Sequence, residues 1–412
     1  MHDQTLASTS LATDRQDTAP ARPALMLRIA DVLMRRNGIG RLHLTLPSGA
    51  SATIGSGTGS AGAAVALRSW HALWRLYRRG ALGFAEAYMD GDIDTDDLKA
   101  VFELYLANAS ALSHVVPRID DTRPTDRTFH EGRANTRAGS RRNIADHYDL
   151  GNAFYRLWLD DSMLYSSGIH ADRTTTLEAA QAAKVARVVS ALELDTGSNV
   201  LEIGCGWGAV AQAIAANGAR VHAITLSSEQ LAAARDRIAT AGLADRVNIC
   251  LEDYRDTAGQ FDRIVSIEMI EAVGEENWPL FFDTLSARLK PGGTAVLQAI
   301  TIRDDAFAQY RANPDFIQRY VFPGGMLPTV ELMDRRAGEA GLAFETVERF
   351  GASYALTLAD WRRRFEAAWP QIEALGFDEH FRRLWRYYLI YCEVGFEIGH
   401  IDVGLYRLRK PA

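Results

Sequence analysis

The chain has 412 residues, which is long enough for two domains that each bury a hydrophobic core. Hydrophobic residues make up 47% of the sequence and charged residues 24%, as in an ordinary globular protein. The net charge of −7 argues against a nucleic-acid-binding surface over the whole molecule, and no stretch approaches the roughly 20 apolar residues that span a bilayer.

The N-terminus and the cysteines exclude further classes. Residues 1–22 are mostly small and polar and lack the basic and apolar regions of a secretory signal, so we expect them to be disordered and the protein to be cytoplasmic. The three cysteines, Cys205, Cys250 and Cys392, are odd in number and widely spaced. They fit neither a disulfide framework nor a zinc site, and we expect no metal.

Residues 23–116 predict a small α+β N-terminal domain. The expected elements are a helix at 24–34, strands at 41–46 and 51–54, a flexible connection at 55–60, and helical patterns at 69–79 and 98–107 on either side of 84–91. Residues 117–142 then carry arginines without apolar periodicity, at Arg118, Arg123, Arg127, Arg133, Arg137, Arg141 and Arg142. This basic strip is either a solvated linker or a surface that binds anionic phospholipid, where each arginine contributes on the order of 1 kcal/mol.

Residues 143–412 predict a doubly wound α/β sheet. From residue 175 helical and strand patterns alternate, and Thr175-Thr-Leu-Glu178 forms a capping box that opens the first helix. Strands are expected near 199–204, 219–225, 246–251, 261–267 and 293–301. Ligands bind at the carboxyl ends of the strands in such sheets.

Two aromatic-rich stretches lie beyond this pattern. Residues 302–330 have no strand–helix alternation and indicate a cap inserted over the site. The C-terminal aromatics recur near helical spacing, so we expect most to pack between paired helices and some to line an acyl channel. They are Trp361, Phe365, Trp369, Phe381, Trp385, Tyr387, Tyr388 and Tyr391.

A glycine loop follows the strand at 199–204. Gly204, Gly206 and Gly208 have G-x-G-x-G spacing and precede a helical pattern, which is the geometry in which backbone approaches a nucleotide-like ligand. The spacing differs from the dinucleotide motif, and Ile224-Thr-Leu226 stands where an NAD enzyme would carry an acidic residue. The pattern therefore favours S-adenosylmethionine over NAD.

From Asn143 onward the sequence resembles the cyclopropane fatty acid synthases, which are S-adenosylmethionine-dependent lipid C-methyltransferases. Besides the glycine loop, the resemblance is carried in family order by His147-Tyr-Asp-Leu-Gly-Asn152, Leu164-Tyr-Ser-Ser167, Glu252-Asp-Tyr-Arg-Asp256, Met269-Ile-Glu271, Tyr320-Val-Phe-Pro-Gly-Gly325 and Phe350-Gly-Ala-Ser-Tyr354. It implies a Rossmann-like class I methyltransferase fold behind a small N-terminal domain. It also makes His147 an orienting hydrogen-bond partner rather than a base.

The resemblance also assigns cofactor residues. Thr225, Leu226 and Gln230 would contact the ribose and its neighbours, Glu252 and Asp253 would lie by the adenosine, and Tyr165 and Ser166 would close over the methionine end. Ser227-x-x-Gln230 is at the same time a capping box for the next helix, and both roles are compatible. Cys205 is expected to be a small loop residue.

In the resembled family the alkene attacks the sulfonium methyl group, and a bound bicarbonate ion removes a proton from the resulting cation. The ion is held by a Cys, a Glu, a His, backbone and a Tyr. Glu271 and Tyr354 match here, whereas Ser167 replaces the Cys, Gln298 replaces the His, and Glu268 stands where a Gly is usual. We predict that the Glu268 carboxylate replaces bicarbonate and raises the pKa of one member of the Glu268–Glu271 pair. The alternative is that Glu268 faces solvent or caps the next helix.

The expected function is methyl transfer to the double bond of an unsaturated acyl chain, on a phospholipid, with a cyclopropane as the leading product. A methyl or methylene branch, a small-molecule acceptor, and a non-catalytic lipid-binding protein are the alternatives. The expected location is the inner face of the membrane, at an anionic lipid surface, and a homodimer stays open.

Overall fold

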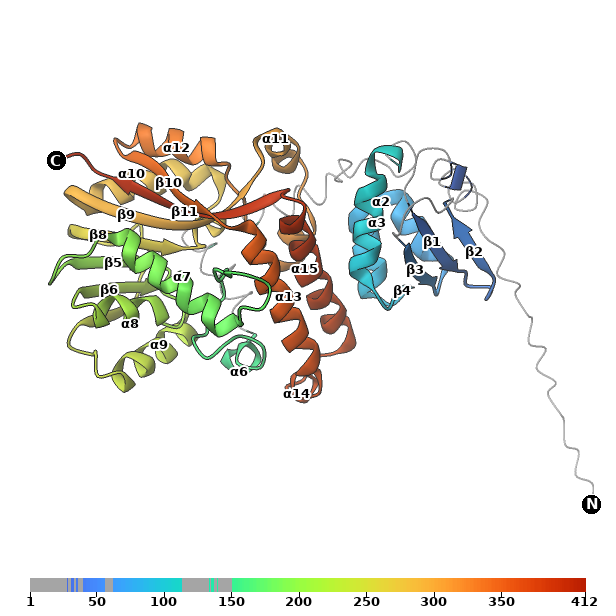
Figure 1. Ribbon diagram of the computed structural model, residues 1–412, viewed down its shortest axis with the longest axis horizontal. Helices are drawn as coiled ribbons and strands as arrows, with labels where there is room; N and C mark the ends of the chain where they lie inside the picture. Colours follow the sequence, from blue (N-terminus) through green and yellow to red (C-terminus); the bar gives the residue numbers. More distant parts are fainter. Residues whose placement is uncertain are drawn as a thin grey trace, which may run out of the picture. The chain divides into compact units, whose positions relative to one another are not determined.

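The computed structural model describes residues 28, 31, 32, 35, 40–55, 62–112, 133, 135, 136, 139 and 150–412. They form two compact units, Met1–Pro117 and Arg118–Ala412, each with its own hydrophobic core (Figure 1). The expected disordered segment 1–22 and His147 lie outside the described residues, as does nearly all of the basic strip. Within the described residues, no helix is both long and apolar enough to cross a bilayer.

In its described residues, the first unit pairs a small mixed sheet with two long helices. Its strands, in the order β2-β1-β3-β4, are β1 (Arg41–Thr45), β2 (Ser51–Ile54), β3 (Gly62–Leu67) and β4 (Ile93–Asp94). The pattern did not reveal β3, which pairs parallel with β1. Helix α2 (Trp70–Met89) is longer than the pattern indicated because it continues through a kink at Gly80, and α3 (Leu98–Leu112) follows. Of the helix expected at 24–34, residues 28, 31 and 32 are described, and they are helical.

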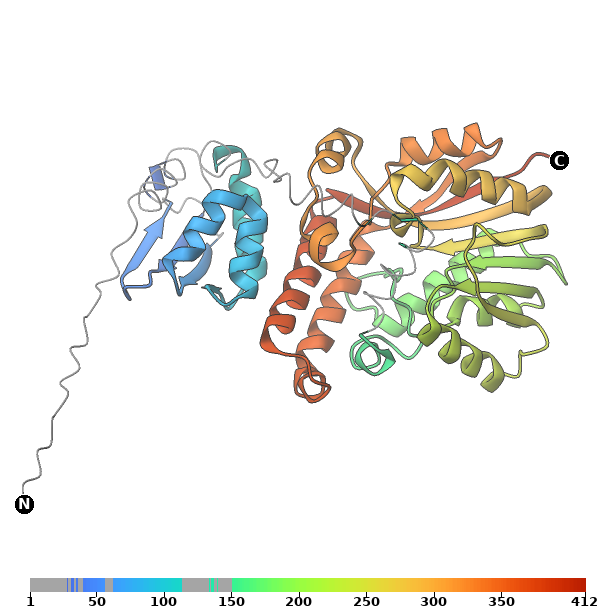
Figure 2. The ribbon, with the colours of Figure 1, turned by 180° about the vertical axis from the view of Figure 1, so that it is seen from behind.

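The second unit is built on a seven-stranded sheet with the order β10-β11-β9-β8-β5-β6-β7 (Figures 1 and 2). The strands from β9 through β7 run parallel, whereas β11 is antiparallel to both β9 and β10. Their bounds are β5 (Asn199–Ile203), β6 (Arg220–Thr225), β7 (Val247–Leu251), β8 (Phe261–Ile267), β9 (Leu289–Ile302), β10 (Ala343–Arg349) and β11 (Ile401–Arg409). The sequence patterns missed β10 and β11.

Alternate residues of the parallel strands face two helical layers. Helices α7 (Leu177–Leu192), α8 (Ala209–Ala216) and α9 (Ser228–Thr240) pack in sequence on one face. On the other face, Leu201, Ile224 and Ile264 share a core with α10 (Trp278–Arg288) and α12 (Val330–Glu339). Helices therefore cover both faces of the sheet, as in a doubly wound fold.

The remaining helices complete the second unit. A short helix α6 (Asn152–Tyr155) precedes α7, and the expected cap contains α11 (Asp304–Ala312) and a π-helical turn (Ile317–Val321) rather than an irregular segment. Helices α13 (Gly351–Ala367) and α15 (Glu379–Glu397) pack together, with α14 (Trp369–Ala374) between them in sequence. Most of the C-terminal aromatics are buried there, as expected for core packing, including Trp361, Phe365, Trp385 and Tyr387.

The start of helix α7 differs by one residue from the prediction. Helix α7 begins one residue later than the Thr175 capping box requires, because Thr176 is the N-cap and its hydroxyl accepts from the Ala179 N–H. The Glu178 carboxylate therefore pairs with Arg364 instead of closing a box. At α9 the Ser227 hydroxyl accepts from the Gln230 N–H, as expected for the N-cap.

Candidate active site

The glycine loop joins β5 to α8 at the carboxyl edge of the sheet. Gly204, Gly206 and Gly208 all have positive φ, at 81°, 51° and 83°, which is the conformation that glycine adopts without steric cost. A Cβ at Gly208 would meet Ala234 at 3.1 Å, so glycine there serves packing against α9. A Cβ at Gly206 would have no atom within 4 Å and would project into open space. Among the three glycines of the loop, Gly206 is thus the one whose Cβ would meet no packed atom.

The end of β6 provides a rigid polar wall beside this loop. The Thr225 hydroxyl donates to the Gln230 side-chain oxygen at 2.9 Å and accepts from the Ser227 N–H at 3.2 Å. Thr225 and Gln230 are both buried, whereas Leu226 is half-buried. Gln230 therefore combines the helix-cap position with a side chain that points back to the strand end.

The two acidic residues after β7 differ in their partners. Asp253 is 2% exposed and forms a bidentate ion pair with Arg255, at 2.8 and 2.6 Å. The Glu252 carboxylate is half-buried and lies 3.2 Å from Nε2 of His222 on β6. Each carboxylate is thus bound by a neighbouring side chain of the same unit.

Tyr165 and Ser166 lie in a tight segment before α7. The Tyr165 hydroxyl is 2.8 Å from that of Tyr388 on α15, and its ring lies among the rings of Tyr155, Trp158 and Trp361. The Ser166 hydroxyl accepts at 2.6 Å from Nζ of Lys184, whose side chain is fully buried on α7. This segment therefore brings aromatic rings and a buried cation to one place.

Glu268 follows β8 and points into the protein. Its carboxylate accepts from the Ser167 backbone N–H at 2.9 Å, the Gln298 side-chain amide at 2.7 Å and the Tyr354 hydroxyl at 2.7 Å. The Ser167 hydroxyl does not take part, because it donates to the carbonyl of Gly168 at 2.8 Å. These contacts exclude the alternative in which Glu268 faces solvent.

The backbone of Glu268 has an unusual conformation. Its φ is +46°, in the left-handed region, which costs a non-glycine residue about 1–2 kcal/mol. The resembled family usually has glycine at this position. Because the three hydrogen bonds all end on the side chain, the contacts of the carboxylate offset a conformation that the backbone itself disfavours.

Glu271 lies one short turn later, in the 3₁₀ helix Ile270–Ala272. One carboxylate oxygen accepts from the Ile300 N–H at 2.5 Å, and among the described residues the other oxygen, which is buried, has no hydrogen-bond partner. Burial, followed by the charge of Glu268, raises the pKa of Glu271 to about 8. Burial also raises the pKa of Glu268, but its three donors and the Lys184 charge oppose this. Both carboxyl groups thus have raised pKa values, and the donors and the cation around Glu268 favour its ionised form more than the N–H of Ile300 favours that of Glu271.

Lys184 is the buried cation of this cluster. Burial lowers its pKa to about 8, against the opposing charges of Glu268 and Asp160. A buried charge without a partner is costly, so Lys184 and Glu268 stabilise each other's ionised forms. The sequence pattern missed Lys184, although it interrupts the buried stripe of α7 between Ala180 and Val188.

The cap contacts the backbone of Glu271. The Met326 N–H donates to the Glu271 carbonyl at 2.8 Å, and the Gln318 amide donates to the Gly325 carbonyl at 2.9 Å. The Gly324 carbonyl accepts from Asn135 at 2.7 Å. The segment 322–326 therefore covers the 3₁₀ helix that carries Glu271.

Residues 135–405 match the family model described as mycolic acid cyclopropane synthetase. The chain belongs to this family. It is 40% identical to the tuberculostearic acid methyltransferase UfaA1 of Mycobacterium tuberculosis, over 80% of this chain and 79% of that protein. It is 36% identical to the cyclopropane-fatty-acyl-phospholipid synthase of Escherichia coli, over 84% of this chain and 87% of that protein.

A solved structure of the family has the same fold. The mycolic acid cyclopropane synthase CmaA1, complexed with SAH and CTAB, is 31% identical and superimposes with a TM-score of 0.61, covering 66% of this chain and 98% of that chain. The family, the class I methyltransferase fold and the S-adenosylmethionine-dependent modification of lipids are thereby confirmed. The protein is an enzyme of this kind, and lipids are its substrates.

Proposed function

We propose that the protein transfers a methyl group from S-adenosylmethionine to the double bond of an unsaturated acyl chain, with Glu268 as a built-in base. The observation that carries this proposal is the Glu268 carboxylate itself. It accepts from Ser167, Gln298 and Tyr354, the residues expected around a bound bicarbonate, and it lies beside Glu271. A protein carboxylate thus occupies the set of donors that would otherwise bind an anion.

S-adenosylmethionine fits the edge of the sheet that the glycine loop leaves open. Gly206 leaves space above the loop, buried Thr225 and Gln230 form the adjacent wall, and Tyr165 with Ser166 would close the methionine end. Leu226 and Asp253 would complete the adenosine side, whereas Glu252, also expected there, lies 3.2 Å from His222. When bound, the cofactor supplies an electrophilic methyl group on sulfur.

The chain's own residues supply the rest of the chemistry. Attack by the acyl double bond would form a carbon–carbon bond to the methyl group while its bond to sulfur breaks, and would leave a positive charge on the neighbouring carbon. Such a cation needs negative charge, π faces and the absence of water. Glu268 supplies negative charge when it is ionised, the rings around Tyr165 supply π faces, and the cap covers the site against water. Glu268 then removes a proton, and Tyr354 keeps its carboxylate oriented.

The product depends on which proton Glu268 removes. Loss from the added methyl group closes a cyclopropane, the leading product, whereas loss from an adjacent chain carbon leaves a methyl-branched alkene. A carboxylate fixed by three hydrogen bonds has less freedom of position than a bound ion, and a 40% identical relative is named a methyltransferase rather than a cyclopropane synthase. These two observations make the branched product the second candidate.

The test compares two isosteric variants of the pair. Purified enzyme is given S-adenosylmethionine and vesicles of an unsaturated phospholipid, and the products are analysed by mass spectrometry for the gain of one CH₂, with double-bond chemistry to separate ring from branch. Glu268→Gln should lower turnover by roughly 10²–10⁴-fold, the contribution of a general base. Glu271→Gln should retain more activity, because burial raises the pKa of Glu271 to about 8 and keeps its carboxyl group largely protonated at neutral pH. A larger loss of turnover in Glu271→Gln than in Glu268→Gln would show that Glu268 is not the base.

The membrane surface is the remaining part of the proposal. We infer that the basic strip at 117–142 contacts anionic phospholipid, which supports access to acyl chains by a protein whose described helices do not cross the bilayer. Arg137, Arg141 and Arg142 are the densest part of the strip.

A further inference from the structure

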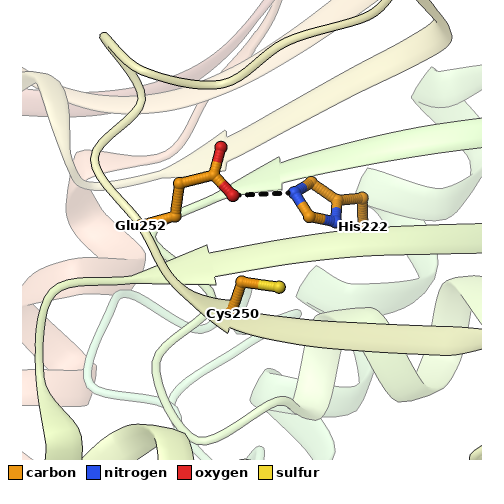
Figure 3. A group of neighbouring side chains, drawn as sticks. All are labelled: His222, Cys250 and Glu252. Atoms are coloured by element: carbon orange, nitrogen blue, oxygen red, sulfur yellow. Dashed lines mark hydrogen bonds and ion pairs between the residues drawn. The ribbon is translucent and has the colours of Figure 1, made fainter.

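A second cluster of reactive side chains lies on the sheet at a distance from the carboxylate pair. His222 is on β6, Cys250 is on β7, and Glu252 follows β7 directly (Figure 3). One potential ligand atom from each lies within 4.8 Å of the other two. Two strands, β5 and β6, separate β7 from β8, which leads to Glu268.

Strand geometry explains why these three side chains meet. Residues 248, 250 and 252 alternate onto one face, and the parallel register pairs His222 with Asn248 and Ile224 with Cys250. His222 therefore shares the face of Cys250 and Glu252. No helix occurs in the connection 252–260, and all three side chains are half-buried, so an ion can reach them from solvent.

The surroundings of His222 hold its ring as they would for a metal ligand. Its Nδ1 lies 3.3 Å from the side-chain amide of Asn248, and the Phe261 ring stacks at 6.1 Å with an interplanar angle of 14°. As placed, the Asn248 Nδ2–H donates to Nδ1 and leaves the proton on Nε2, whereas a turn of the amide would present its oxygen to Nδ1–H and free Nε2 for a metal. That Nε2 is the atom that faces Glu252, at 3.2 Å.

Although the cysteine spacing alone led us to expect no metal, we propose from this geometry that His222, Cys250 and Glu252 bind one zinc ion, with water as the fourth ligand. A nitrogen, a sulfur and an oxygen donor form a mixed set that zinc accepts in tetrahedral geometry, whereas Mg²⁺ and Ca²⁺ require oxygen ligands. Binding takes the imidazole as neutral and releases the thiol proton to solvent. Because β7 is the edge strand of the sheet, the ion ties this strand to β6.

The experiment uses the full chain, freed of metal by a chelator and then titrated with Zn²⁺ or Co²⁺. We expect one Zn²⁺ per chain by calorimetry, a rise in melting temperature, and a cobalt–thiolate charge-transfer band in the near ultraviolet. Cys250→Ser should remove the band, and His222→Gln should weaken Zn²⁺ binding at least about tenfold. Cys392→Ser, at a half-buried cysteine on α15, is the matched control and should keep both signals.

Asn248→Ala keeps all three ligands and tests the support of the imidazole. It should weaken Zn²⁺ binding by about tenfold or more while retaining the cobalt band. No Zn²⁺ binding by the wild-type chain would overturn the proposal. Binding that is equal in wild type, Cys250→Ser and His222→Gln would place the ion elsewhere and overturn it as well.

Discussion

Replacing Glu268 by glycine separates the carboxylate from the fold that holds it. The change removes the carboxylate to which Ser167, Gln298 and Tyr354 donate hydrogen bonds. It also restores the residue usual in the family at a φ of +46°. The three donors stay in place because each belongs to a different, well-packed segment. The variant therefore keeps an anion-binding arrangement without the anion.

The expected magnitudes differ for stability and for catalysis. Relief of the left-handed backbone stabilises the fold by about 1–2 kcal/mol. Each donor left without a partner costs about 1–3 kcal/mol, and the buried Lys184 loses its counter-charge, so the variant should be less stable unless water or an anion fills the space. Turnover, in contrast, should fall by roughly 10²–10⁴-fold, because a general base is lost.

The assay measures methyl transfer to vesicles with and without added bicarbonate, beside thermal melts of both proteins. We expect bicarbonate to restore part of the activity of Glu268→Gly, because a small anion can accept from the same donors, and to leave the wild type unchanged. A fully active Glu268→Gly with an unchanged product would refute the role of Glu268. Stimulation of the wild type by bicarbonate would show that an external anion acts despite Glu268.

Four further predictions follow from the same geometry. Gly206→Val should weaken S-adenosylmethionine binding by at least about tenfold in calorimetry, because the valine side chain enters the ligand space. The control Gly218→Val has the same positive-φ strain at the opposite edge of the sheet and should bind S-adenosylmethionine normally, and equal losses in both variants would assign the effect to strain. Lys184→Met removes the cation that lowers the pKa of Glu268, so the acid limb of the pH–rate profile should move to higher pH. The control Lys290→Met, at a more exposed ion pair, should leave that limb in place, and an unmoved limb in Lys184→Met would contradict the pairing of Lys184 with Glu268. Binding to anionic vesicles should weaken with salt and in the triple Arg→Gln variant at Arg137, Arg141 and Arg142, and indifference to both would leave the strip a plain linker. Trp278→Ala should cost about 3–5 kcal/mol of unfolding free energy in denaturant titrations, because Trp278 is 1% exposed and donates to the Ile270 carbonyl; a loss below about 1 kcal/mol would contradict this packing.

The sequence was sufficient for features that depend on local pattern. Strand and helix periodicity predicted the parallel core of the sheet, and the glycine spacing with Ile224-Thr-Leu226 favoured S-adenosylmethionine over NAD. The motif order predicted the family, and a Glu at a usual Gly position was visible as a departure at Glu268. These features were readable because each depends on neighbours within a few residues along the chain.

Only the tertiary structure decided which groups meet. The sequence cannot show that Glu268 accepts from Ser167, Gln298 and Tyr354, because these residues lie far apart along the chain. Ser167 and Gln298, for example, are separated by 131 positions. Nor could the pattern show Lys184 as the buried partner of that carboxylate, since a single lysine on a helix reads as solvated until its burial is known. His222, Cys250 and Glu252 likewise share a face only because two strands pair in one register. Both features depend on long-range packing: burial shifts the pKa values of Lys184, Glu268 and Glu271, and strand register brings His222 to Cys250 and Glu252.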